Sequence, residues 1–532
     1  MAIIHLLNDL LRPLIPDSAL IAFFLFLTAL FSARRSISCQ FGRIGRGTWS
    51  LLAVVILATL WIRLTIPPHQ HVIYVDEAQY MEAGKEMLRT GRQGELILSV
   101  GWPFVLRLAF ALFGTSNWVA INTSILLGTL SVVPLFLLAY LATDRTDLAL
   151  VAAVVLSLYP PHVRWSATAA SNASSLFFML LTLVFFMISY RTERTSVAWL
   201  AWMSIAFTTQ FRPENHVLIV LFPLGRAILG SSGKRMLGSG HMVQGFIMLL
   251  LVLPNLAQVL EDNVYTNWIE SDSDGRMTGS NWSLSNLFNN SRDYAPELFG
   301  GVYHPMIVSA LAAIGVIGLT TRRRRESLFL MTGFVVLWLV YFTSWFQTLA
   351  GRDRFYMGLY PFIAIYAAAG AVHVADALSG LLTRSWTRWC ALILASVLAV
   401  HIYIPYTMFG SMTYSQSTLA LETRIPEQAE QELPPGCVIV ANWPVILRST
   451  TELEVVDLDE FIQLLPVQEE LFGRTDCILF FEDYTCLDWK PYLAQRCELL
   501  RMMFNTEPYR SYVEGETRYT FHRITGRNIA VG

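Results

Sequence analysis

The chain has 532 residues, of which 54% are hydrophobic and only 15% are charged, and its formal net charge is −2. Apolar runs of about 16–25 residues recur along it, which is the length that a helix needs to cross the ~30 Å hydrocarbon core of a bilayer. This composition excludes a soluble protein with one large core, and the small net charge gives no reason to expect a nucleic-acid partner.

The apolar runs predict about twelve transmembrane helices. We place these spans near residues 18–33, 48–66, 118–142, 147–163, 172–190, 196–211, 214–229, 242–260, 303–320, 327–347, 355–378 and 388–408. Three of them are short, and these leave the count open by one or two. The short ones are 147–163, 196–211 and 214–229.

Positive charge in the short loops orients the predicted helices. If the spans alternate, the loops that are rich in Lys or Arg all fall on one side of the membrane, which we predict to be cytoplasmic. Those residues are Arg34, Arg35, Arg43, Arg46, Arg191, Arg194, Lys234, Arg235, Arg322 to Arg325, Arg384 and Arg388. The expected fold is therefore an α-helical polytopic membrane domain over 1–408, with external loops at 67–117 and 261–302, and a small extracytoplasmic α/β domain over 409–532.

The first external loop contains the stretch VDEAQYMEAGKEMLRTG at 75–91. It follows Pro67 and Pro68, and its pattern predicts an amphipathic helix along the membrane surface. Asp76 with Gln79 three residues later is a capping-box variant, and Gly91 suits the position just after a helix. On this interpretation Asp76 only satisfies backbone N–H groups at the start of the helix.

A second interpretation gives the two adjacent carboxylates a chemical role. Anionic lipid repels acidic groups, so a helix that only anchored the chain would carry Lys or Arg here. Asp76 and Tyr80 share one helix face at i, i+4, whereas Glu77 points elsewhere. Two carboxylates beside the bilayer indicate proton transfer from a hydroxyl or the binding of a metal ion. The two interpretations are compatible, and the sequence leaves both open.

This loop resembles the first external loop of the GT-C glycosyltransferases, in particular the group of the protein O-mannosyltransferases and the lipid A aminoarabinose transferase. The Asp-Glu-x-x-Tyr-x-Glu pattern of that group is matched by Asp76, Glu77, Tyr80 and Glu82. Three later segments resemble the family in the same order, and the resemblance spans about residues 48–380. They are FGTSNWVAINTSILLGTLSVVPLFLLAYLAT, TTQFRPENHVLIVLFPL and GRDRFYMGLYPFIAIYAAAGA.

Two departures from the family pattern leave the donor sugar and the acceptor open. In SVGWPFVLRLAF, Trp102 stands where the aminoarabinose transferase group has a Lys that is attributed to the donor phosphate. In SATAASNASS, Asn172 replaces an acidic residue. The contact attributed to that Lys therefore cannot be transferred to this chain, although Arg107 stands close by in sequence as a substitute.

The resemblance implies an inverting glycosyltransferase that moves a sugar from a polyprenyl-phosphate donor to a hydroxyl of a lipid, glycan or protein acceptor. It implies Asp76 as the base, with Glu77 as the second candidate. Arginine side chains suit the donor phosphate because their planar fork binds phosphate oxygens and stays charged. The candidates are Arg352, Arg354, Arg212 and Arg164. The alternative role for Arg212 is a structural ion pair with Glu214. For Arg352 and Arg354 it is an ion pair with Asp353 or an anchor at the membrane interface.

Candidate residues for the acceptor, the sugar and a metal lie around the same loop. For the acceptor or sugar they are Tyr80, Glu82, Lys85, Trp102 and His304. For a metal they are Glu77, His69 and His71, although no spacing here is a metal signature and the use of a divalent cation stays open. The expected partners are the lipid-linked donor, membrane lipids and the acceptor. We expect a bacterial inner-membrane protein with its active site and C-terminus outside the cytoplasm.

Two other functions compete with this one. A GT-C-related polymerase or ligase would use a lipid-linked oligosaccharide as donor. A transporter of a lipid-linked substrate would have internally repeated halves and charges at mid-membrane. The sequence shows no such repeat, and its charges gather on the outer side, which favours chemistry at the interface.

In the tail at 409–532, short strand and helix patterns replace the long apolar runs of the preceding residues. GCVIVAN and DCILFFED predict two parallel strands, DLDEFIQLLPVQEELFG predicts helix, and RSYVEGETRYTFHRI predicts a hairpin at Glu-Gly. No Gly-rich phosphate loop follows GCVIVAN, so we expect no nucleotide-sugar site. Four cysteines lie here; Cys486 and Cys497 are the better candidate for a disulfide, whereas Cys437 and Cys477 fit a disulfide or buried thiols equally well.

Overall fold

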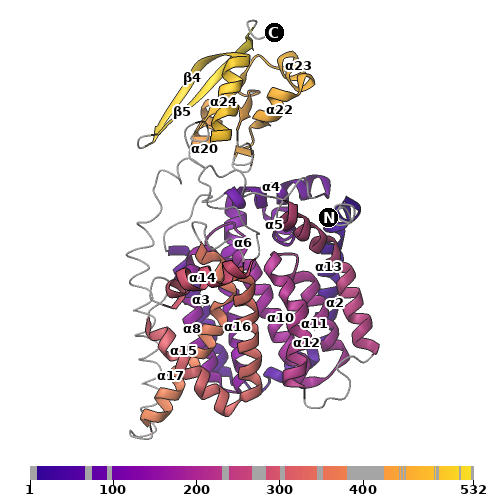
Figure 1. Ribbon diagram of the computed structural model, residues 1–532, viewed down its shortest axis with the longest axis vertical. Helices are drawn as coiled ribbons and strands as arrows, with labels where there is room; N and C mark the ends of the chain where they lie inside the picture. Colours follow the sequence, from indigo (N-terminus) through magenta and orange to yellow (C-terminus); the bar gives the residue numbers. More distant parts are fainter. Residues whose placement is uncertain are drawn as a thin grey trace.

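The structure is a computed structural model with two parts, a helical bundle and a small sheet domain beyond one end of it (Figure 1). It describes residues 9–65, 75–92, 99–230, 239–265, 283–299, 306–343, 352–379, 425–442, 444, 447–448, 451–483, 486, 491–514 and 517–528. The expected boundary at 408–409 lies outside these residues.

In the described residues, the bundle contains α-helices and three short 3₁₀ helices. Its first half comprises η1 (Arg12–Leu14), α2 (Ile15–Phe41), α3 (Arg46–Thr65), α4 (Val75–Thr90), α5 (Gly101–Phe113), α6 (Asn117–Leu130), α7 (Val132–Thr143), α8 (Thr146–Ser157), α9 (Pro160–Ser166) and α10 (Asn172–Thr192). Its second half comprises α11 (Thr195–Thr208), η2 (Pro213–His216), α12 (Val217–Leu229), α13 (Ser239–Tyr265), α14 (Leu284–Phe299), α15 (Met306–Arg322), α16 (Arg324–Thr343), η4 (Arg352–Gly358) and α17 (Tyr360–Ser379).

Seven helices in the described part of the chain are long and apolar enough to cross a membrane, or eight if α8 and α9 form one span bent by 62°. That bend follows from Pro160 and Pro161, because proline cannot continue the hydrogen bonds of a preceding helix. The segments 196–211, 214–229 and 303–320 form the shorter helices α11, α12 and α15. The segment 388–408 lies outside the described residues, so the predicted count of about twelve is not confirmed.

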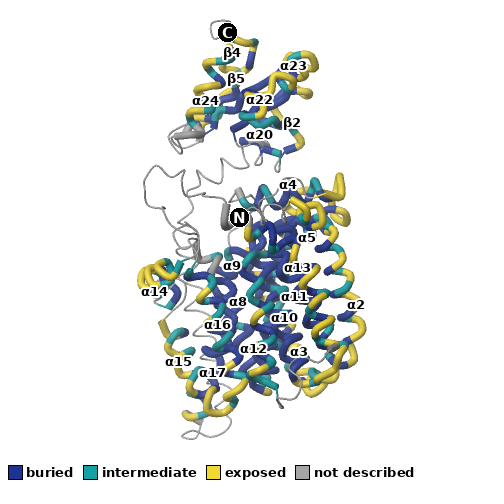
Figure 2. The backbone as a smooth tube through the Cα atoms, turned by 45° about the vertical axis from the view of Figure 1, so that its right-hand side comes forward, coloured by how far each residue is buried: buried dark blue, intermediate teal, exposed yellow. Residues whose placement is uncertain are grey.

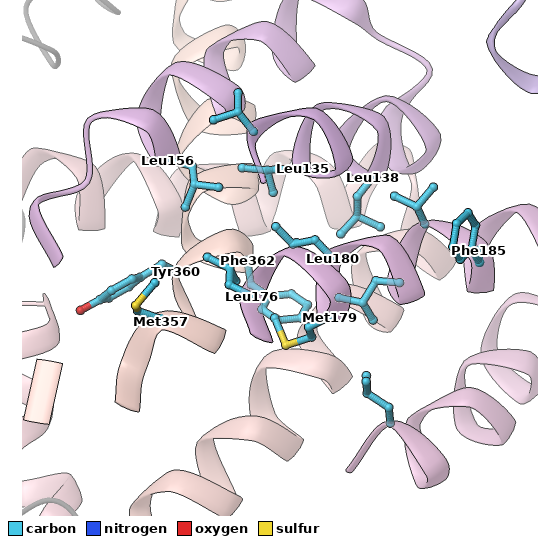
Figure 3. Close-up of a cluster of buried hydrophobic side chains, with 14 of the residues drawn as sticks. Leu135, Leu138, Leu156, Leu176, Met179, Leu180, Phe185, Met357, Tyr360 and Phe362 are labelled. Carbon is cyan, nitrogen blue, oxygen red and sulfur yellow. The ribbon is translucent and has the colours of Figure 1, made fainter. Parts of the chain in front are cut away.

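The middle of the bundle is the most buried part (Figure 2). Buried residues make up 78% of the apolar stretch of α10 and 89% of that around α17, against 22% in α3. The outer faces of α2 and α3 expose apolar side chains such as Phe31 and Trp61, as helices that face lipid do. In the interior, Leu135 of α7, Leu156 of α8 and Leu180 of α10 lie in one cluster with Phe362 of α17 (Figure 3).

Helices α15 and α17 touch backbone to backbone. A Cβ atom at Gly315 would lie 1.8 Å from the carbonyl oxygen of Tyr366, and one at Gly370 would lie 1.9 Å from that of Leu311. Two glycines facing each other therefore set the distance between these helices, as small residues do in membrane bundles.

The C-terminal part is a five-stranded sheet in the order β2-β1-β3-β5-β4, with helices packed on it. Its elements are α20 (Ile425–Glu432), β1 (Val438–Ala441), β2 (Glu454–Asp457), α22 (Leu458–Gln463), α23 (Leu465–Arg474), β3 (Ile478–Glu482), α24 (Pro491–Met503), β4 (Phe504–Glu514) and β5 (Thr517–Arg527). β1 pairs in parallel with β2 and β3, and β5 pairs antiparallel with β3 and β4. The predicted parallel strands, helices and hairpin are confirmed; β2 was not predicted.

Two disulfides stabilise this domain. Cys486 is bonded to Cys497, as expected from the sequence. Cys437 is bonded to Cys477 at the starts of β1 and β3, so the alternative of two buried thiols is wrong. A disulfide that joins neighbouring parallel strands fits a compartment that permits oxidation.

Candidate active site

Helix α4 lies across the end of the bundle that faces the sheet domain (Figure 1). Its apolar face is buried, with Ala78 and Met81 fully covered, and it packs on α5 at Gly84, where a Cβ atom would lie 2.9 Å from that of Leu106. The helix ends as predicted: Gly91 has φ 76° and its N–H bonds to the carbonyl of Met87. It begins at Val75, so Asp76 lies in the first turn and not at the predicted N-cap position.

The carboxylate of Asp76 forms an ion pair with Arg354 of η4, with 2.8 Å between Oδ2 and Nη1. The Asp76 side chain is 40% exposed, whereas that of Arg354 is 11% exposed. Asn172, at the start of α10, donates from Nδ2 to the carbonyl oxygen of Arg354 at 3.1 Å and so fixes η4 against the bundle. The predicted base and one predicted phosphate-binding arginine are thus in direct contact, and the base stays accessible.

Two of the predicted arginines lie beside the buried indole ring of Trp165. Trp165 of α9 is fully buried, and the guanidinium carbons of Arg164 and Arg354 lie 5.3 Å and 5.6 Å from its ring centroid. Such positions allow cation–π attraction. Arg354 therefore lies beside both Asp76 and Trp165, Arg164 lies beside the same indole, and Trp165 is a site residue that the sequence did not indicate.

Tyr80 lies one helical turn from Asp76 and is buried. Its hydroxyl oxygen accepts a hydrogen bond from Ser171 Oγ at 3.0 Å, and Ser171 belongs to the turn between α9 and α10. Burial is the main cause that raises the pKa of Tyr80; the charge of Asp76 adds to it, while Arg212 and Arg354 oppose it. The phenol is therefore a neutral group in the positive field of both arginines.

Arg212 lies close enough to Tyr80 to affect its pKa, but its own ion pair is with another residue. It forms an ion pair with Glu214 of η2, with 2.9 Å between Nη2 and Oε1, and both side chains are largely buried. The Arg212–Glu214 ion pair that FRPEN offered as the alternative is therefore present. Arg212 still acts on Tyr80 through its charge.

Glu77 and Trp102 bind the backbone N–H and the backbone carbonyl of the same residue, Ala169. Glu77 Oε2 accepts from the backbone N–H of Ala169 at 2.7 Å, and Trp102 Nε1 donates to the carbonyl oxygen of Ala169 at 2.6 Å. Both side chains are 0% exposed. They therefore tie α4 and α5 to the turn between α9 and α10, which carries Ser171 and leads to Asn172. This burial favours a positioning role over direct contact with a substrate.

Glu82 and Lys85 lie farther along α4 and face other charges. Burial raises the pKa of Glu82, against the opposing charges of Lys85 and Arg448, and burial lowers the pKa of Lys85, against the charges of Glu452, Glu82 and Glu430. Arg448, Glu452 and Glu430 belong to the sheet domain. The structure thus places these two residues beside that domain and does not bring them together with Asp76.

Three expected residues cannot be placed, since His69, His71 and His304 lie outside the described residues, and of Arg352 only the backbone is described. Within the described ranges, no group of three or more His, Cys, Asp or Glu side chains could hold a metal ion. Asp76 and Glu77 already bind an arginine and a backbone N–H. The described residues therefore form no metal centre, and we derive no step through one.

Comparison with known proteins bears on the fold of the chain. The sequence model of the family described as dolichyl-phosphate-mannose-protein mannosyltransferase matches residues 99–257. That range is less than half of the chain; it contains Trp102, Arg164 and Arg212 but not Asp76 or Arg354. A search of curated protein sequences finds no match.

Solved structures match nearly the whole chain. The crystal structure of ArnT from Cupriavidus metallidurans in the apo state has a TM-score of 0.59 and 16% identity, covering 90% of this chain and 97% of that one. The same protein bound to undecaprenyl phosphate has a TM-score of 0.56 and 16% identity, covering 90% and 98%. The archaeal oligosaccharyltransferase AglB from Archaeoglobus fulgidus, in complex with an inhibitory peptide and a dolichol-phosphate, has a TM-score of 0.55 and 11% identity, covering 90% and 74%.

These identities are low and therefore establish the fold alone. The chain is an integral membrane protein with the GT-C glycosyltransferase fold, and the predicted resemblance is confirmed.

Proposed function

We propose that this protein is an inverting glycosyltransferase, which moves a sugar from a polyprenyl-phosphate donor to an acceptor hydroxyl at the outer face of a bacterial inner membrane. The observation that carries the proposal is the ion pair between Asp76 and Arg354, because it joins a reachable carboxylate to a largely buried cation at the membrane surface. A lipid phosphate bound to a protein of the same fold supports this choice of donor.

In the proposed reaction the donor phosphate takes the place of Asp76 on Arg354. The guanidinium then binds a phosphate oxygen, and Arg164, which lies beside the same indole, supplies a second positive charge. Since Arg354 is largely shielded from water, its charge acts on the phosphate with little screening. The same movement frees the carboxylate of Asp76 to meet the acceptor.

The chemical step is a single displacement at the anomeric carbon. The acceptor oxygen attacks this carbon and gives its proton to the carboxylate of Asp76. The bond between the anomeric carbon and the phosphate oxygen breaks, and polyprenyl phosphate leaves with the electron pair. The two arginines stabilise the negative charge that grows on the departing phosphate. Glu77, Trp102 and Asn172 act at a distance, by fixing the α9–α10 turn and η4.

A second candidate is a ligase that uses a lipid-linked oligosaccharide. It has the support of one similar structure, an oligosaccharyltransferase with a TM-score of 0.55. The same base and cations would serve this reaction, because only the size of the transferred glycan differs.

A transfer assay in proteoliposomes tests the proposal. The wild type and Asp76→Asn are incubated with a panel of radiolabelled polyprenyl-phosphate sugars, followed by lipid-linked oligosaccharides. Asparagine keeps the shape of aspartate but cannot take the proton, so we expect turnover by the wild type and its loss in the variant. Glu86→Gln is the matched control, since Glu86 pairs only with the exposed Arg89 on the same helix. Equal turnover by Asp76→Asn and the wild type would contradict the proposal.

A further inference from the structure

A second cavity lies at the opposite end of the bundle from Asp76. It has a volume of about 90 Å³ and opens between the α7–α8 turn and the ends of α15 and α17. Its polar lining includes Arg145, Arg322, Arg323 and His373, and no Asp or Glu is among the described residues that line it. The positive-loop pattern predicts that this end faces the cytoplasm.

The cavity lies next to the close contact between α15 and α17. Gly315 and Gly370 bring the two backbones together, and Gly318 follows one turn later on α15. A Cβ atom at Gly318 would lie 3.4 Å from Cγ and 3.5 Å from Nδ1 of His373, so this glycine lets the backbone of α15 pack against the imidazole, which borders the cavity. Leu148, Leu319 and Val372 line the rest of the cavity with apolar surface.

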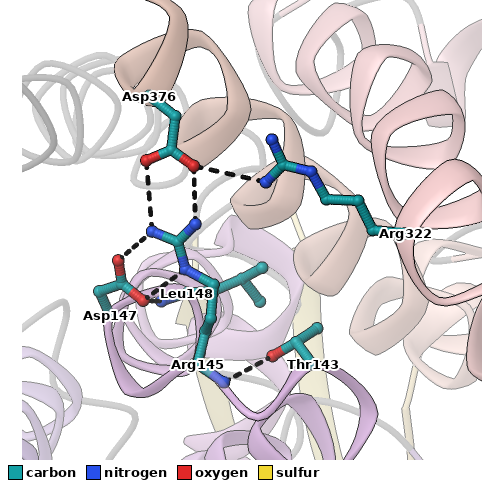
Figure 4. Close-up of polar contacts among 6 residues, drawn as sticks. All are labelled: Thr143, Arg145, Asp147, Leu148, Arg322 and Asp376. Atoms are coloured by element: carbon teal, nitrogen blue, oxygen red, sulfur yellow. Dashed lines mark hydrogen bonds and ion pairs between the residues drawn. The ribbon is translucent and has the colours of Figure 1, made fainter. Parts of the chain in front are cut away.

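The four basic side chains differ in how fully they are bound. Arg145 is saturated, because its guanidinium bonds to both Asp147 and Asp376 (Figure 4). Arg322 reaches Asp376 only at 3.5 Å and is 56% exposed. Most donors of the Arg322 guanidinium therefore face no acceptor among the described residues.

Two further donors border the cavity. Arg323 makes one contact of 2.9 Å with Asp144 and is 42% exposed, so most of its five donors face no described acceptor. Nδ1 of His373 is buried and has no hydrogen-bond partner among the described residues. A buried polar atom without a partner is costly, and an acceptor placed in the cavity would satisfy it.

We infer that this cavity binds the phosphate group of an anionic phospholipid of the cytoplasmic leaflet. Arg322 and Arg323 hold the phosphate oxygens and His373 donates from Nδ1, while the apolar lining covers the first carbons of the glyceride. A basic pocket between membrane helices at the cytoplasmic side is the type of site that anionic head groups occupy. A free phosphate has the same charge but leaves the apolar lining uncovered, which favours the lipid. The lipid would join α7 and α8 to α15 and α17.

Native mass spectrometry of the full-length protein in detergent, titrated with phosphatidylglycerol, tests this inference. We expect one tightly held lipid per chain, and binding weaker by about tenfold or more in the double variant Arg322→Gln/Arg323→Gln, because it loses charge-assisted hydrogen bonds. Arg324→Gln/Arg325→Gln is the matched control. It removes the same amount of positive charge from two neighbouring arginines that do not line the cavity. The control should bind like the wild type.

His373→Leu keeps the test decisive if the double variant does not fold. Leucine fills a similar volume and removes a buried donor that has no described partner, so we expect an unchanged or higher melting temperature together with weaker lipid binding. Equal loss in both arginine pairs would overturn the inference, as would equal binding of phosphatidylcholine. Displacement of the lipid by millimolar inorganic phosphate, with equal protection against heat, would show a soluble anion site instead.

Discussion

Arginine–aspartate pairs occur at both ends of the bundle, but they are built differently. At the end beside the sheet domain, which we call the outer end, the carboxylate of Asp76 pairs with the guanidinium of Arg354 and remains 40% exposed. At the other end, Arg145 is held by Asp147 and Asp376 together, and Asp376 also reaches Arg322. A substrate oxygen can displace the exposed carboxylate of Asp76 from Arg354, whereas three carboxylate–guanidinium pairs hold the inner end together.

This difference shows that an ion pair must be judged by what surrounds it. Around Asp76 and Arg354 lie a buried indole, a second arginine and a buried phenol. Around Arg145 lie helix ends that the pairs hold in place, with α7, α8 and α17 meeting there. The first arrangement suits chemistry and the second suits structure, so substitutions at the two ends should act on different observables.

The largest effect is expected from Asp76→Asn. Loss of the base should reduce the transfer rate by about 10²–10⁴-fold, with a melting temperature close to that of the wild type. Asp376→Asn, the same substitution at the inner end, should keep the transfer rate. Initial rates and thermal unfolding of both variants test this contrast, and comparable rate losses in the two would erase the distinction between the ends.

Arg354→Gln should act through the donor phosphate. We expect kcat/KM for the lipid-linked donor to fall by about 10²–10³-fold, as for other groups that stabilise developing charge. Arg292→Gln is the control, because Arg292 is an exposed arginine paired with its neighbour Asp293. If kcat/KM in Arg354→Gln stayed within twofold of the control, the arginine would have no part in donor binding.

Two substitutions of Glu77 distinguish a positioning role of this residue from a role as the catalytic base. Glu77→Ala leaves the buried N–H of Ala169 without an acceptor, which should cost about 1–3 kcal/mol of unfolding free energy. Glu77→Gln retains an acceptor oxygen and should keep most of the activity. Thermal unfolding and initial rates check this pair; a stable but inactive Glu77→Gln would make Glu77 the base in place of Asp76.

The smallest effect is expected at the inner end. Asp376→Asn removes one of two carboxylates from Arg145, and all three side chains are about one-third exposed or more. Partly exposed pairs contribute about 0.2–1 kcal/mol each, so the melting temperature should fall slightly and fall less at high salt. Identical melting temperatures at low and high salt would indicate that this cluster does not stabilise the bundle.

Much of this fold could be predicted from the sequence because many of its elements depend only on residues that are neighbours in the chain. The surface helix with Gly91 after it, the hairpin around Glu-Gly and the two strands joined by Cys437 and Cys477 all follow from short stretches. Strand β2 was missed because it has only four residues and runs directly into the helical pattern of α22.

The sequence predicted residues of α4 for the candidate site, but not which of them are buried or which residues they contact. Sequence spacing shows that Asp76 and Glu77 point in different directions, but not which of them is buried. That depends on Ala169, which the fold brings to Glu77 from the turn between α9 and α10. The partner of Asp76 and the role of Trp165 likewise depend on contacts between distant segments, which no local pattern contains.

The most direct test of the central claim is the affinity of polyprenyl phosphate, the proposed leaving group, for three proteins in neutral-lipid nanodiscs. Because Asp76 competes with the phosphate for Arg354, we expect Asp76→Asn to bind it as tightly as the wild type or more tightly, and Arg354→Gln to bind it about tenfold or more weakly. Unchanged binding by Arg354→Gln, or equal weakening in both variants, would contradict the exchange of Asp76 for the donor phosphate.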